Sequence, residues 1–507
     1  MIQRLKSPGL SVVSGILLSL AFPSWLIPSL HPWTGWLAWI GLVPLLVAIE
    51  NAGPRRAFLL GWLSGISFWA STLYWIGGIR EMEYMALPAV SCFALYLGLF
   101  TGGWAALLRW KRMGPYWLAA PALWVILEWL RGWLFSGFSW TPLGASQWAF
   151  PAMFLSARFL GVSVVSAAVV SVNMAVWSLV RRGGERKIGV YASAVLLLVL
   201  LVLSTVAANQ VRRDVSGAKP VRVALLQGNF TEAEKWALPL EVLLSRFEAL
   251  SLAAGKEKPD IILWPESATA SELSRDALTQ ARISRLAART KSVQMAGAIY
   301  LDKDGKFYNA AVALSPKGPF AVYRKQHLVP FGEFIPAWIR TILPFARKLT
   351  EGVGDYSPGS DPAPMDLGAA GKAGVGICYE AIFPGIYRNQ ARQGAEYLLN
   401  QTNDAWYLLS AATYQHALGS ITRAVECGRY LARCANTGLT LVVTPEGRMV
   451  SRLGLFETGV QIGDLKHISG VTAYARWGDL PLLLAAIFLL AVSILAGKRT
   501  ETGQAGR

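Results

Sequence analysis

Long apolar runs separated by short charged loops constrain this chain more than any other feature. Eight runs approach the length of about 20 residues that an α-helix needs to cross a bilayer. They cover residues 9–28, 34–50, 57–78, 86–108, 117–134, 155–180, 188–207 and 480–497. Charged residues make up only 16% of the chain and the mean hydropathy is +0.39, whereas soluble domains contain about 25% charged residues. These features predict a membrane protein with about eight transmembrane helices.

The basic residues of the loops predict the orientation of these helices. Arginines and lysines precede the first run and follow the second, fourth, sixth and eighth runs, whereas the alternate loops carry little beyond Arg80 and Arg131. The positive-inside rule then places both termini in the cytoplasm and the segment between the last two runs outside, in the periplasm of a Gram-negative cell. The formal net charge of +17 follows this loop pattern, so it does not indicate a nucleic-acid partner. The N-terminal run lacks a clear A-x-A site, and we interpret it as an uncleaved first helix.

Residues 219–470 have a different character from the 1–210 and 480–497 membrane segments. Short β-rich runs are expected at 221–227, 261–264, 294–301, 310–314, 321–324, 374–378, 397–400 and 439–443. Helical stretches are expected at about 237–254, 272–289, 382–393 and 411–432. Several strands are continuously apolar, which is typical of strands covered on both faces. The pattern predicts an α/β domain of about 250 residues inserted before the last membrane helix.

Reactive side chains follow three of the predicted strands. Glu266 follows "LWP", Lys325 lies in "YRKQH" eight residues before Glu333, and Cys378 ends "GVGIC". In layered α/β folds, strand ends on one side gather distant residues into one site. A thiol has an ordinary pKa of about 8.5, so a nucleophilic Cys378 needs a base, which Glu266 can supply. Lys325 can stabilise both a thiolate and an oxyanion.

Each of these residues alone also has a purely structural interpretation. Cys378 could be a core thiol, Glu266 and Glu380 could cap following helices, and Lys325 and Glu333 could be surface charges. His327 and His416 suggest a Cys–His pair, but their spacing favours structural histidines.

The four cysteines show no metal-ligand spacing and no disulfide framework. Cys427 and Cys434 lie seven residues apart in a helical-looking segment, a spacing that favours one packed face. No metal or nucleotide motif is present in the sequence, and we expect no cofactor.

The ordered motifs of the chain resemble the apolipoprotein N-acyltransferase family over essentially its whole length. They are "LLQGN" (225–229), "LWPES" (263–267), "YRKQHLVPFGEFIP" (323–336), "GVGICYE" (374–380), "NDAW" (403–406) and "RAVECGRYLARCANTG" (423–438). The resemblance implies a nitrilase-like four-layer αββα sandwich. It makes Glu266 the base, Lys325 the oxyanion and thiolate partner, and Cys378 the nucleophile. It also implies that Glu333 is a second essential glutamate.

The same resemblance assigns supporting roles to Trp236, Tyr379, Glu380, Asn403 and Trp406. Where this family commonly continues "NDAW" with Phe-Gly, the chain has Tyr407-Leu408, which leaves the shape of that loop open.

The resemblance implies transfer of an acyl chain from a phospholipid, typically phosphatidylethanolamine, to the α-amine of a diacylglyceryl apolipoprotein. The reaction would pass through a thioester on Cys378, as the final step of lipoprotein maturation in the bacterial inner membrane. Residues 331–349 mix apolar and basic side chains, which suits either an interfacial arm or a buried helix. Two alternatives remain: a membrane-anchored carbon–nitrogen hydrolase (an amidase) in which water replaces the amine, and a binding module without turnover.

We predict from the loop charges that Lys187 and Arg499 face the cytoplasm, whereas Tyr300 and Gly447 face outward. Single cysteines at these positions, probed on intact cells with a membrane-impermeant thiol reagent, test the topology. Labelling is expected at 300 and 447 only. Labelling at 499 would show that the orientation is wrong.

Overall fold

The computed structural model describes residues 2–79, 86–111, 113–180, 186–335 and 356–505. The chain forms two compact units. The first contains Met1–Gln210, Tyr407–Thr422 and Thr472–Arg507, and the second contains Val211–Trp406 and Arg423–Val471. The second unit therefore includes most of the segment that the sequence predicts as an α/β domain.

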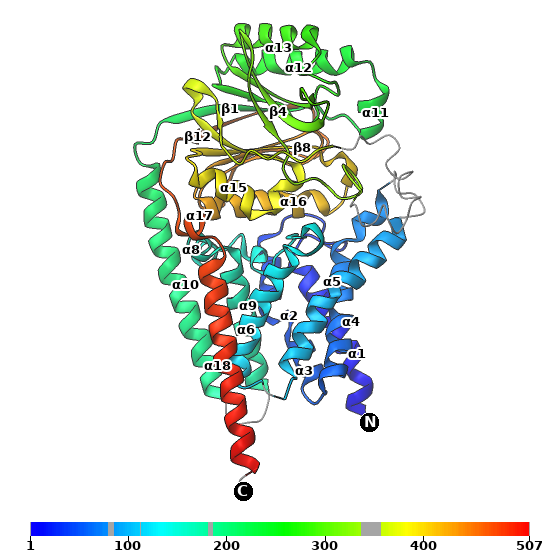
Figure 1. Ribbon diagram of the computed structural model, residues 1–507, viewed down its shortest axis with the longest axis vertical. Helices are drawn as coiled ribbons and strands as arrows, with labels where there is room; N and C mark the ends of the chain where they lie inside the picture. Colours follow the sequence, from blue (N-terminus) through cyan, green and yellow to red (C-terminus); the bar gives the residue numbers. More distant parts are fainter. Residues whose placement is uncertain (1, 80–85, 112, 181–185, 336–355, 506–507) are drawn as a thin grey trace. The chain divides into compact units, whose positions relative to one another are not determined.

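The first unit is helical, and each predicted apolar run contains helical residues (Figure 1). Its long elements are α1 (Ile2–Leu20), the η1–α2–α3 series (Pro32–Leu37, Ala38–Gly41, Val43–Ile49), α4 (Pro54–Thr72), α5 (Ala86–Leu108), α6 (Tyr116–Arg131), α9 (Val162–Val180), α10 (Arg186–Val215) and α18 (Leu480–Ala505). Among the described residues, five stretches are long and apolar enough to cross a membrane: Pro32–Ile49, Ala86–Leu108, Val162–Val180, Lys187–Val215 and Leu480–Gly497. The total of about eight spans stays a prediction.

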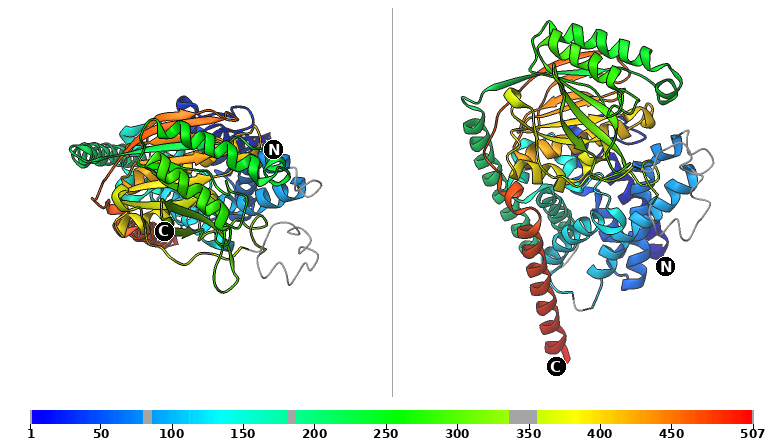
Figure 2. Two further views of the ribbon diagram at one scale, coloured as in Figure 1. Left: turned by 90° about the horizontal axis from the view of Figure 1, so that it is seen from above. Right: turned by 45° about the horizontal axis from the view of Figure 1, so that its top comes forward.

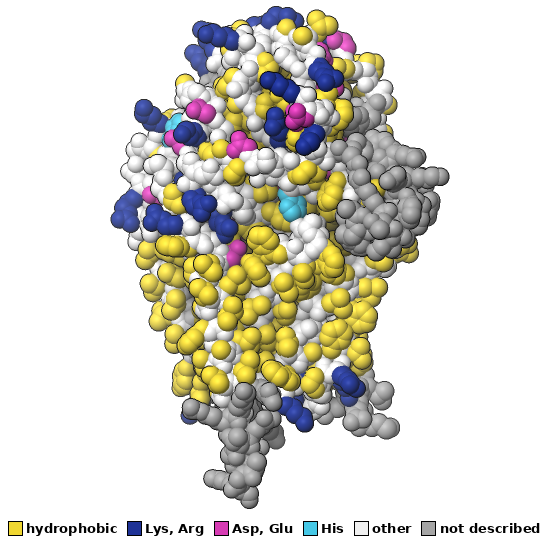
Figure 3. All heavy atoms as spheres, in the orientation of Figure 1, with side chains coloured by type: hydrophobic (Ala, Val, Ile, Leu, Met, Phe, Trp, Pro, Cys, Tyr) yellow, Lys and Arg dark blue, Asp and Glu magenta, His cyan; other side chains and the backbone are white. Residues whose placement is uncertain are grey.

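The surface and the packing of these helices suit a lipid environment. Exposed hydrophobic side chains gather on α10 and α18, among them Leu198, Val202, Ile487 and Phe488 (Figure 3). Small residues let α4 and α5 approach closely, because a Cβ added at Gly65 would lie 2.7 Å from the Cα atom of Gly98. Close backbone approach through small residues is typical of membrane helix pairs.

The second unit contains two six-stranded sheets. The first sheet has the order β12 (Gly459–Lys466), β1 (Pro220–Gln227), β2 (Ile261–Leu263), β3 (Val293–Leu301), β4 (Phe307–Ser315), β5 (Gly318–Arg324). The second has the order β11 (Met449–Leu453), β10 (Thr440–Val443), β9 (Leu431–Ala435), β8 (Tyr397–Thr402), β7 (Lys372–Ile377), β6 (Met365–Asp366). Strands β1, β2 and β3 pair in parallel, as do β7, β8 and β9.

The two sheets stack face to face with helices outside them, which confirms the predicted αββα sandwich. Alternate strand residues such as Val223, Val375 and Leu399 are buried between the sheets. Leu226 and Ile262 face the other way, toward α12 (Leu240–Gly255) and α13 (Ala277–Thr290), which lie side by side over the first sheet (Figures 1 and 2). Helix α15 (Pro384–Arg392) lies on the outer side of the second sheet (Figure 1).

One predicted helix is wrong in its C-terminal part. Helix α16 (Ala412–Cys427) ends at Cys427 because Gly428 adopts a φ of +63°, a left-handed conformation that ends helices. The chain then enters β9, where the single S–H group of Cys434 lies 3.1 Å from the carbonyl oxygens of both Leu226 and Leu263. Cys427 and Cys434 therefore share no helix face, and Cys434 packs between the sheets instead.

Gly297 of β3 packs closely against the backbone that follows β2, and a substitution at this position tests that packing. A Cβ atom at this position would lie 2.8 Å from the Cα of Glu266 and 2.7 Å from the backbone nitrogen of Ser267. We expect Gly297→Ala to lower the free energy of unfolding by about 1–3 kcal/mol, the usual cost of overpacking. Gly385→Ala in α15 is the matched control, since nothing lies within 4 Å of its Cβ and alanine favours helices. Thermal unfolding in detergent measures both; equal midpoints for Gly297→Ala and the wild type would contradict the packing.

Candidate active site

A buried lysine lies between two carboxylates at the ends of the first sheet's strands. The Nζ atom of Lys325 is 3.2 Å from Oε1 of Glu266 and 2.9 Å from Oε1 of Glu333. Lys325 follows β5 directly and its side chain is only 1% exposed. Glu266 lies three residues beyond β2, and Glu333 lies in the segment after β5. The strand ends thus bring together three residues that are up to 67 positions apart in the sequence.

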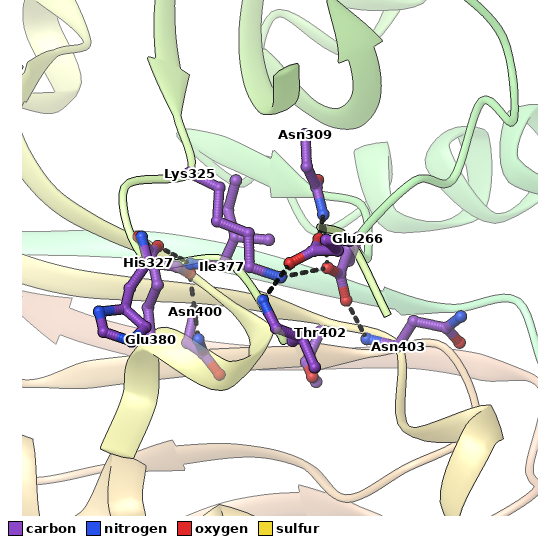
Figure 4. A network of polar contacts seen from close by, with 12 residues as sticks. Glu266, Asn309, Lys325, His327, Ile377, Glu380, Asn400, Thr402 and Asn403 are labelled. Atoms are coloured by element: carbon purple, nitrogen blue, oxygen red, sulfur yellow. Dashed lines mark hydrogen bonds and ion pairs between the residues drawn. The ribbon is translucent and has the colours of Figure 1, made fainter. Parts of the chain in front are cut away.

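Asn309 of β4 joins the same cluster (Figure 4). Its Nδ2 atom donates to Oε1 of Glu266 at 2.7 Å and to Oε1 of Glu333 at 2.8 Å. The other oxygens of these carboxylates accept from the backbone N–H groups of Asn403 and Val329, both at 2.8 Å. Glu266 is therefore not a helix cap and Glu333 is not a surface carboxylate. Sequence reasoning missed Asn309, although an amide in the apolar run "NAAVAL" was a visible signal.

Lys325 and Glu266 hold each other in the ionised form. Burial alone would lower the pKa of Lys325, but Glu266 and Glu333 raise it well above its ordinary value. Burial works against the Glu266 carboxylate, yet Lys325 and Lys235, with the hydrogen bond from Asn309, leave its pKa below the ordinary value. Glu266 can therefore accept a proton at neutral pH.

Cys378 lies where β7 ends, at the start of the 3-10 turn Cys378–Ile382. Its φ of +50° is a left-handed conformation that a non-glycine residue adopts at a cost of about 1–3 kcal/mol. Burial raises the pKa of the thiol well above its ordinary range, Glu266 adds to this effect, and Lys325 opposes it. The resting thiol thus keeps its proton, so the expected stabilisation of a resting thiolate by Lys325 is not the dominant effect.

The carboxylate of Glu380 forms hydrogen bonds both with β7, which ends just before Cys378, and with the backbone just after Lys325. Its carboxylate accepts from the backbone N–H groups of Ile377, Gln326 and His327 at 2.6, 2.6 and 3.0 Å. The hydroxyl of Tyr323 on β5 donates to the same carboxylate at 3.0 Å. Burial raises the pKa of Glu380 to about 7, against the effect of the backbone donors. Glu380 therefore links the second sheet to the first. It does not cap α15, whose N-cap is Phe383.

The remaining predicted residues lie at different places around the cluster. The side chain of Asn403 donates to Oε2 of Glu232 at 2.7 Å and accepts from Asn436 at 3.0 Å. Tyr379 is buried and packs edge-on against Phe383. Trp406 is half-buried in the turn Asp404–Tyr407. Trp236 belongs to α11 (Glu232–Ala237), but its side chain lies outside the described residues.

The two histidines that the sequence suggested for a Cys–His pair both stack on aromatic rings. His327 stacks on Phe383 with ring centres 3.6 Å apart, and His416 of the helical unit stacks on Trp140. Both contacts are of the structural kind that the sequence favours. Most of the arm expected at 331–349 lies outside the described residues. Within the described ranges, no group of three histidine, cysteine or acidic side chains could hold a metal ion.

Comparisons with known proteins agree over both units. Residues 222–474 match the carbon-nitrogen hydrolase family, and residues 14–175 match the apolipoprotein N-acyltransferase N-terminal domain. An apolipoprotein N-acyltransferase from Geobacter metallireducens is 36% identical over 97% of this chain and 95% of that protein. One from Methylococcus capsulatus is 31% identical over 99% of each chain. With the sandwich, the apolar helices and these matches over nearly its full length, the chain belongs to the apolipoprotein N-acyltransferase family.

Proposed function

We propose that this protein transfers an acyl chain from a phospholipid to the α-amine of a diacylglyceryl-cysteine at the N-terminus of an apolipoprotein. Phosphatidylethanolamine is the proposed donor, and the site would lie on the periplasmic side of the inner membrane. The observation that carries the proposal is the buried Glu266–Lys325–Glu333 cluster in the domain where Cys378 sits on a strained turn. This set supplies a base, a cation and a nucleophile.

In the first half-reaction, the Sγ atom of Cys378 attacks the ester carbonyl carbon of the phospholipid while Glu266 accepts the thiol proton. The carbonyl oxygen becomes an oxyanion. When the tetrahedral intermediate collapses, the bond to the glycerol oxygen breaks and Glu266 returns the proton to that oxygen. The products are a lysophospholipid and a thioester on Cys378. The raised pKa of the thiol makes this transfer to Glu266 necessary, because few resting thiols are ionised.

Lys325 is suited to stabilise the oxyanion. An ammonium group has three N–H donors, and its partners among the described residues are the two carboxylates. The third donor stays available for the developing charge. Because both carboxylates raise the pKa of Lys325, the ammonium is protonated when the substrate enters the resting site.

In the second half-reaction, the neutral α-amine of the acceptor attacks the thioester carbonyl. Glu266 accepts a proton from the amine nitrogen, the carbon–sulfur bond breaks, and the departing sulfur takes that proton. The acyl chain is then joined to the amine as an amide. No group outside the chain and its two substrates is needed for the proton balance.

We expect phospholipid alone to load Cys378 with one acyl chain, because a thiol nucleophile gives a covalent intermediate before the acceptor binds. Intact-protein mass spectrometry after incubation with phosphatidylethanolamine measures this directly. Neutral hydroxylamine should remove the chain, and a diacylglyceryl peptide should discharge it onto the peptide amine.

Cys378→Ala should abolish loading, whereas Cys92→Ser, at an exposed position in the helical unit, is the matched control and should load normally. Loading that survives in Cys378→Ala would refute the nucleophile. Continuous release of fatty acid without an acyl-enzyme would favour the hydrolase alternative, and bound lipid without any cleavage would favour a binding module.

We also expect Glu333→Gln to slow loading by about tenfold or more, because hydrogen bonds between charged groups contribute about 1.5–3 kcal/mol. The variant keeps the size of the side chain but removes one of the two negative charges that face the Lys325 ammonium. Glu257→Gln, at an exposed position, is the control. Single-turnover rates of loading show whether Glu333 supports the reaction or is only a loop carboxylate. Equal rates in the two variants would show that Glu333 takes no part in the reaction.

A further inference from the structure

A second buried lysine lies next to Glu266. Lys235 belongs to α11 and is 6% exposed, and its Nζ atom is 3.4 Å from the backbone carbonyl oxygen of Glu266. Lys235 is not one of the residues assigned above as base, cation or nucleophile. Burying an ammonium group is costly unless it is paired with carboxylates or carbonyls, so its place beside the base requires an explanation.

Helix α11 is fixed by hydrogen bonds at its start and along one side. The hydroxyl of Thr231 accepts from the backbone of Glu234, and the carboxylate of Glu234 accepts from the backbone of Thr231. Such a reciprocal cap stabilises a short helix at its N-terminus. Glu232, in the first turn, lies three residues before Lys235, the spacing at which helical side chains are neighbours.

Asn403 links this helix to the carboxylate of Glu266. Its Nδ2 atom donates to Oε2 of Glu232 at 2.7 Å, while its backbone N–H donates to Oε2 of Glu266 at 2.8 Å. Asn436 donates to Oδ1 of Asn403 and to the carbonyl of Phe230, just before α11. Lys235, Glu232 and Glu266 are thus parts of one connected network.

The charged and titratable groups around Glu266 come from several elements. Lys235 and Glu232 come from α11, Lys325 follows β5, Glu333 and Tyr356 lie in the segments after it, and Cys378 lies at the end of β7. With all carboxylates and both lysines ionised, three negative charges face two positive charges. Removing one lysine would leave an excess of two negative charges, which favours protonation of a carboxylate.

We propose that Lys235 is a positioning residue that holds Glu266 in its ionised form and fixes the backbone of the residue that accepts the thiol proton. The inference rests on the proposed role of Glu266 as the base. Burial lowers the pKa of Lys235, while Glu232, Glu266 and Cys378 raise it. In turn, the charge of Lys235 lowers the pKa of Glu266. This makes protonated Glu266 a stronger acid toward the departing glycerol oxygen and keeps the base available in acidic solution.

The pH dependence of acyl-enzyme formation tests this role with the full-length protein in detergent. The substrate is phosphatidylethanolamine, and the measured quantity is the second-order rate constant for loading of Cys378 in a single turnover. We expect Lys235→Met to move the acid limb of the profile to higher pH by about one pH unit, because Glu266 loses a neighbouring positive charge. Lys235→Arg keeps the charge and should leave the limb near its wild-type position.

Glu232→Gln gives a reading of opposite sign and serves if Lys235→Met does not fold. It keeps an oxygen acceptor for Asn403 but removes a negative charge, so the acid limb should move to lower pH. Damage to the structure alone would lower the rates of both variants without moving the limbs in opposite directions. An unchanged acid limb in a folded Lys235→Met protein, or in Glu232→Gln, would overturn the proposal. Absence of loading in the wild type would instead refute the proposed function itself.

Discussion

The pairing of the Lys325 ammonium with the carboxylates of Glu266 and Glu333 is the interaction on which the site depends. Moving an ammonium group into a protein interior costs several kcal/mol unless opposite charges and hydrogen bonds compensate. Here each carboxylate also accepts from Asn309 and from a backbone N–H group. The sandwich fold provides this arrangement because β2 and β5 end, and the antiparallel strand β4 begins, at the same edge of one sheet.

The second sheet supplies the thiol and the groups that place it. Cys378 and Asn403 follow β7 and β8, which are neighbouring parallel strands. Glu380 then connects the backbone before Cys378 to the backbone after Lys325. Since Lys325 is shared by two carboxylates, it does not generate a thiolate in the resting protein. In the proposed reaction, Glu266 would therefore accept the thiol proton at the moment when Cys378 attacks.

The sequence predicted the parts of this protein that have a strong local signal. Continuous apolar runs marked the helices and most central strands, and the ordered motifs marked Glu266, Lys325, Glu333 and Cys378. It did not predict β11 and β12, whose residues are mostly half-buried or exposed and mix polar with apolar side chains. Asn309 and Lys235 were missed because a single polar residue in a strand or short helix becomes meaningful only when its distant partners are known.

The ionisation state of Cys378 tests the central claim most directly. A thiolate absorbs in the ultraviolet and a thiol does not, so the difference spectrum between the wild type and Cys378→Ser reports the charge on this sulfur. With Lys325 shared by Glu266 and Glu333, and burial raising the pKa of the thiol, no thiolate signal should appear between about pH 5 and about pH 9. A thiolate signal already complete near neutral pH would contradict this account and would show a preformed thiolate–lysine pair.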